Sequence, residues 1–108
     1  MKVKTRSILQ ELNEIADLVS KFNDLKDKRE KLYQERDMMT DEQNRLRENI
    51  SVLGNDNQSV TLRERYIKKL SDQESRFEEI KKELKELDKK IKNLNRTIEE
   101  NMNSLSNP

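Results

Sequence analysis

Apolar side chains recur at alternating steps of three and four residues in two stretches of the sequence, one on each side of its midpoint. This heptad pattern places one apolar stripe along a helix and is typical of coiled coils. The helix-breaking residues agree, because the only proline is Pro108 and the only glycine is Gly54. We therefore predict two long helices. Their apolar seams comprise Ile15, Leu18, Phe22, Leu25, Leu32, Met39, Leu46, Ile50 and Leu53, and then Tyr66, Leu70, Phe77, Ile80, Leu84, Leu87, Ile91, Leu94, Ile98 and Leu105.

Capping and turn residues predict where the two helices begin and end. Ser7 with Gln10, and Thr61 with Glu64, have the spacing of a capping box, which satisfies amide groups at a helix start. Gly54 follows the first seam and is suited to a left-handed residue after a helix. The predicted arms are about 7–53 and about 62–103, and the turn is 54–61. Within it, the turn residues are Gly54, Asn55, Asp56 and Asn57.

A short connection favours antiparallel neighbouring helices. If facing residues have numbers that sum to 116, apolar residues face one another along both seams, and Gln43 faces Gln73. We predict an all-α fold, an antiparallel coiled-coil helical hairpin that occupies 1–108 as one domain. Dimerisation into a four-helix bundle stays open. An alternative is one unbroken helix in a parallel dimer, with residues 54–57 as a bulge.

Polar residues interrupt the first seam at Arg29, Arg36 and Gln43, and the second at Gln73. One interpretation is that the long side chains lie along the seam and carry their charges to solvent. The other is that Arg36, Gln43 and Gln73 form a polar layer that sets the register. We expect Arg36 to neutralise two facing carboxylates, Glu35 and Glu83. Arg29 would find its counter-charge in Asp88 or Glu86.

Additional apolar residues widen the hairpin beyond its seam where the first arm starts and the second arm ends. Two helices cannot cover so wide a face. The sequence therefore predicts either self-association, with a homodimer as the simplest form, or docking onto another protein or domain. The candidate association surface comprises Leu9, Leu12, Val19, Met102 and Leu105.

The charge balance and the residue types argue against several classes of function. The chain has 23 basic and 22 acidic residues, a net charge of +1, so nucleic acid and membrane surfaces are not expected partners. It contains no His, no Cys and no phosphate-binding loop, and we expect no enzyme, no catalytic residues, no metal, no cofactor and no small-molecule substrate. No apolar run could span a bilayer or act as a signal peptide, which leaves the compartment unknown and the cytoplasm as the default.

The segment from Asp41 to Ile80 resembles the C-terminal coiled-coil segment of bacterial and archaeal mucoidy-inhibitor-like proteins of unknown function. The matching residues are Glu42, Gln43, Arg45, Arg47, Asn49, Arg65, Tyr66, Leu70, Gln73 and Glu74. The resemblance covers about 40 of 108 residues and implies a structural or protein-interaction module, as an appendage or fragment of a larger protein, with no activity.

A weaker similarity to prefoldin-like helical hairpins implies an alternative function, a holdase chaperone that binds unfolded clients. In those proteins, β-hairpins join the long helices. Residues 50–53 and 59–62 are apolar enough to form two short strands around the turn. Strands of that length are marginal alone.

Overall fold

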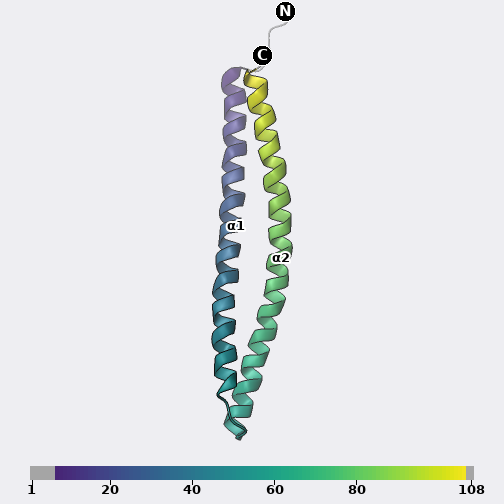
Figure 1. Ribbon diagram of the computed structural model, residues 1–108. Helices are drawn as coiled ribbons and strands as arrows, with labels where there is room; N and C mark the ends of the chain where they lie inside the picture. Colours follow the sequence, from purple (N-terminus) through teal and green to yellow (C-terminus); the bar gives the residue numbers. More distant parts are fainter. Residues whose placement is uncertain (1–6, 107–108) are drawn as a thin grey trace, which may run out of the picture. The chain divides into compact units, whose positions relative to one another are not determined.

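The computed structural model describes residues 7–106, which form two helices and no strand. Helix α1 spans Ile8–Ser51, helix α2 spans Asn57–Ser106, and residues 52–56 connect them. The helices contact each other and run antiparallel, so the predicted all-α helical hairpin is confirmed (Figure 1). The short strands considered at residues 50–53 and 59–62 are not formed, because these residues belong to the helices and the connection.

Contacts divide the chain into two compact units, each made of a segment of α1 and a segment of α2. The terminal unit joins the described residues 7–29 to residues 85–106, and the connecting unit is Glu30–Leu84. Every buried apolar side chain in both units belongs to the predicted seams, because the a and d positions of a helix are the ones that a neighbouring helix covers. They are Leu87, Ile91 and Ile98 in the terminal unit, and Leu32, Leu46, Ile80 and Leu84 in the connecting unit.

The start of α1 has the capping box that its sequence predicts. The backbone amide of Gln10 donates to the Ser7 hydroxyl over 3.1 Å, and the backbone amide of Ser7 donates to the side-chain oxygen of Gln10 over 3.1 Å. Two amide groups without a partner inside the helix are thereby satisfied. At the other end α1 stops at Ser51, two residues before the predicted end at 53.

The predicted start of α2 at residue 62 is wrong, because Asp56 caps the helix and α2 begins at Asn57. One Asp56 oxygen accepts the Ser59 amide over 3.1 Å, and the other accepts the Ser59 hydroxyl over 2.6 Å. These bonds from Ser59 hold the pKa of the Asp56 carboxyl below its usual value. Thr61, the predicted cap, lies inside the helix and donates to the Asn57 carbonyl over 3.0 Å. At its far end α2 continues to Ser106, past the predicted 103.

Gly54 does not take the left-handed conformation that its position after α1 predicts, and no described residue has a positive φ. The carbonyls at this helix end are satisfied differently. The Leu53 amide donates to the Ile50 carbonyl over 3.2 Å. The Arg63 guanidinium donates to the carbonyls of Leu53 over 3.3 Å and Gly54 over 2.8 Å. Because an arginine from α2 supplies these donors, the chain reverses without the glycine cap.

Candidate functional site

The two glutamines of the predicted polar layer are both buried in the connecting unit. Gln43 is 5% exposed and Gln73 is 8% exposed. The Gln43 amide nitrogen donates to Glu74 over 3.2 Å, and its oxygen accepts a long 3.5 Å bond from Arg47. The Gln73 oxygen is buried and has no hydrogen-bond partner. The layer is therefore asymmetric: Gln43 is satisfied, whereas the oxygen of Gln73 is not.

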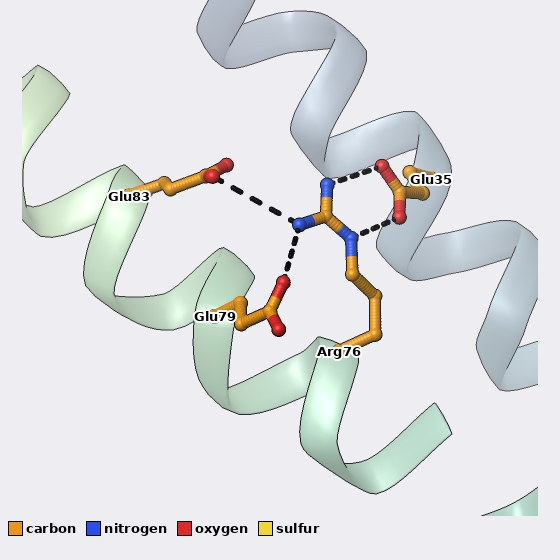
Figure 2. Close-up of polar contacts among 4 residues, drawn as sticks. All are labelled: Glu35, Arg76, Glu79 and Glu83. Carbon is orange, nitrogen blue, oxygen red and sulfur yellow. Dashed lines mark hydrogen bonds and ion pairs between the residues drawn. The ribbon is translucent and has the colours of Figure 1, made fainter. Parts of the chain in front are cut away.

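Arg76, which the sequence analysis did not single out, joins the two helices beside this layer (Figure 2). Its guanidinium makes two parallel bonds to the Glu35 carboxylate, over 2.5 and 2.8 Å. It also reaches Glu79 over 3.0 Å and Glu83 over 3.9 Å. The hydrogen bonds and positive charge of Arg76 hold the pKa of Glu35 below its usual value. A planar guanidinium suits this fork geometry, which fixes orientation as well as adding attraction.

The expectation that Arg36 neutralises Glu35 and Glu83 is therefore wrong, because Arg76 occupies that place. Arg36 is exposed, lies over the Tyr33 ring at 4.8 Å from its centre, and reaches Asp37 over 3.5 Å. A long side chain at a seam position can turn its charged end to solvent, and here that end pairs within its own helix. Arg36 thus lies outside the buried polar layer, which consists of Gln43 and Gln73. Whether this layer sets the register stays a prediction.

Two further ion pairs cross between the helices. Lys69 contacts Glu42 in the connecting unit, and its hydrogen bond lowers the pKa of the Glu42 carboxyl. In the terminal unit Arg29 pairs with Asp88 over 3.1 Å, which is one of its two expected partners. The pairs of Glu42 and Glu35 hold α1 against α2 on the same flank, because the two carboxylates are one heptad apart in α1. Arg76 could have been found from this spacing, which repeats with Lys69.

The candidate association surface lies in the terminal unit, and four of its five residues are exposed. Leu9 is 67% exposed, Leu12 is 49% exposed and Met102 is 52% exposed, and Val19 is exposed as well. Leu105 is half-buried, because it continues the α2 seam. Ile8, at the first residue of α1, is a further exposed apolar side chain. We call Leu9, Leu12, Val19 and Met102 the open-end surface.

The terminal unit also contains a groove that residues of both helices line. It has a volume of about 520 Å³ and is lined by the apolar side chains Leu25 and Leu94 and by the charged Lys21, Asp24 and Lys90. The exposed area of this groove is mainly apolar, although three of its lining side chains are charged. The terminal unit therefore exposes apolar area at this groove as well as at the open-end surface.

Within residues 7–106, no group of three or more His, Cys, Asp or Glu side chains is arranged to hold a metal ion. Nor does either described helix contain a stretch that is both apolar and long enough to cross a membrane. Comparison with protein families, with curated proteins and with solved structures finds no match to the chain. The geometry of the described residues is thus the basis for a functional hypothesis.

Proposed function

We propose that this protein is a coiled-coil interaction module that binds another protein chain through its open-end surface and has no catalytic role. The observation that carries the proposal is the exposure of Leu9, Leu12 and Met102, in contrast to the apolar residues of the seam, which are buried or half-buried. Large apolar side chains grouped on one face favour a contact that removes them from water. Within the terminal unit, the buried Leu87, Ile91 and Ile98 and the ion pair of Arg29 with Asp88 then support this surface.

Site-specific photo-crosslinking in the cells that produce the protein tests this function. A photoreactive amino acid is placed at position 12, in the open-end surface, or at position 38. Met38 is the matched control, because it is an exposed apolar residue of the same helix in the other unit. We expect protein adducts from position 12 and few from position 38. Equal yields from both positions, or no adduct from position 12, would contradict an interaction through this surface.

A holdase chaperone of the prefoldin-like kind is the second candidate, and the same exposed apolar residues favour it. A holdase would suppress the aggregation of many unrelated unfolded proteins, whereas an interaction module binds one partner. The double substitution Leu12→Glu with Met102→Glu should abolish suppression if the surface grips clients. A protein that does not suppress aggregation of a denatured test enzyme, yet is crosslinked at position 12, supports the interaction module.

A further inference from the structure

The apolar flank of α1 in the terminal unit carries no charge at its centre from Leu9 to Ser20, although the exposed Asp17 lies at its edge. Leu9, Leu12, Asn13, Ala16, Val19 and Ser20 are all exposed and lie on one side of the helix, since they follow steps of three and four. None is charged, although 42% of the chain is Asp, Glu, Lys or Arg. We call these six residues the neutral face. In so charged a chain, a helix face in contact with water would carry charges. We therefore expect the neutral face to contact a partner surface that is uncharged as well.

The apolar members of the neutral face are spaced symmetrically. Leu9, Leu12, Ala16 and Val19 follow one another at steps of three, four and three. The series therefore reads the same in both directions, and an antiparallel copy of α1 sets Leu9 against Val19 and Leu12 against Ala16. Each apolar residue then meets another, and the small Ala16 leaves room for Leu12. A symmetric dimer needs this self-complementarity, in which one patch meets itself about a twofold axis.

The length of the neutral face matches the overlap that this arrangement allows. In the same register, Ile8, the first residue of α1, faces Ser20, so the two helices overlap over residues 8–20. Asp17 and Asp24 lie at the edge of this face, and the first charged residue at its centre is Asp27, beyond the overlap. In a parallel pair, by contrast, symmetry would set each of these charges beside its own copy, which is unfavourable. The centre of the neutral face is thus uncharged throughout the antiparallel contact.

From these observations we propose that the neutral face of α1 binds the same face of a second copy of this chain, with the two α1 helices antiparallel. The proposal rests on the proposed function and names its partner. An overlap of 13 residues is about 20 Å long at 1.5 Å per residue, so the interface is at the small end of specific interfaces. The dimer should accordingly be weak, with dissociation within the range of about 1 µM to 1 mM.

Sedimentation equilibrium of the purified chain from about 1 µM to about 1 mM tests the association. We expect a reversible monomer–dimer equilibrium, which Ala16→Glu weakens about 30-fold or more, because a symmetric contact buries two unpaired carboxylates. Ser71→Glu is the control, since it adds the same charge at an exposed position of the connecting unit. Circular dichroism confirms that both variants stay helical. A monomer at every concentration, or a dimer that Ala16→Glu leaves intact, overturns the proposal.

Disulfide exchange tests the geometry, because the chain contains no cysteine. Chains with Leu12→Cys and chains with Ala16→Cys are mixed and oxidised. An antiparallel pair favours the mixed disulfide between positions 12 and 16, whereas predominance of the two symmetric disulfides would refute it. Asp24→Cys, in the groove of the terminal unit, should form few disulfides. If the purified chain is monomeric but position 12 is crosslinked to a different protein in cells, the second-copy proposal fails and the interaction module stands.

Discussion

Replacing Gln73 by Leu should stabilise the hairpin more than replacing Gln43 by Leu. Leaving a buried oxygen unpaired costs about 1–3 kcal/mol, and the Gln73 oxygen is buried without a partner. Gln73→Leu removes that cost and adds apolar contact in a position that is 8% exposed. The Gln73 side chain also contributes a hydrogen bond that lowers the pKa of the Glu42 carboxyl, and its loss offsets part of this, so we expect a gain of about 1–2 kcal/mol in the free energy of unfolding.

Gln43→Leu is the matched comparison. Gln43 is buried to a similar extent, but its side-chain nitrogen and oxygen both have hydrogen-bond partners. The substitution loses the bond to the Glu74 carboxylate, and hydrogen bonds to charged groups contribute about 1.5–3 kcal/mol. Part of the apolar gain is thereby cancelled, and we expect a change of about 0–1 kcal/mol. Urea denaturation followed by circular dichroism measures the free energy of unfolding of both variants. In thermal unfolding, a difference of about 1 kcal/mol shifts the melting temperature by about 4–8 °C. If Gln43→Leu stabilises as much as or more than Gln73→Leu, the asymmetry of the layer is refuted.

The double Leu variant tests whether the glutamine layer sets the register. Met39→Cys with Phe77→Cys reports the predicted facing pair, and Leu46→Cys with Phe77→Cys reports a slip by one heptad. With both glutamines present, a short thiol-reactive linker should join only the first pair. With both replaced by Leu, we expect the slipped pair to react as well, because an all-apolar seam no longer distinguishes the registers. A stabilised variant that crosslinks only in the first pair would show that the glutamines do not set the register.

Three further results are expected. Ile80→Ala should cost about 3 kcal/mol in urea denaturation and Ile67→Ala about 1 kcal/mol, because these isoleucines of one helix are 1% and 52% exposed; equal losses would contradict the burial. Glu35 has a folded-state pKa below its usual 4.5, so its pair with Arg76 stabilises the hairpin above that pH and is lost as the pH falls through the folded pKa. Arg76→Gln should therefore reduce the loss of stability on acidification, while Lys68→Gln, which breaks an exposed pair within α2, should change it little. Gly54→Ala should leave the melting temperature unchanged or raise stability by about 0.5 kcal/mol, since φ is not positive and the added carbon meets Asp56 at 3.4 Å; a loss above about 1 kcal/mol would refute this conformation.

The helices and their seam were predictable because a heptad pattern repeats the same information many times. One polar interruption, such as Gln43, does not disturb a pattern supported by residues on both sides. The start of α2 was not predictable in the same way. Asn55, Asp56, Asn57, Ser59 and Thr61 can each cap a helix, and the sequence contains no repeat that chooses among them. Asp56 caps the helix because both its oxygens bind Ser59, and this contact becomes visible only with the backbone in place.

The Arg76 contacts were missed for a different reason. Facing seam residues have numbers that sum to 116. The expected flanking pair, Glu35 with Glu83, has the sum 118, which is close to that value. The observed flanking pairs, Glu35 with Arg76 and Glu42 with Lys69, share the sum 111 instead. Flanking positions recur every seven residues, so Glu35 can meet a partner at position 76 or at position 83, which correspond to sums of 111 and 118. The seam register alone therefore does not identify the ion pairs beside it.

The two units differ in the interactions that select their contacts. In the connecting unit, Arg76 and Lys69 join α2 to carboxylates of α1, and charges of opposite sign select this pairing over others. On the neutral face of the terminal unit no such charges exist, and shape alone must select a partner. A contact without charges forms slowly and weakly, but it depends little on ionic strength. Salt should accordingly weaken the ion pairs within the hairpin while leaving the association of two copies nearly unchanged, so that folding and association can be separated by raising the salt concentration.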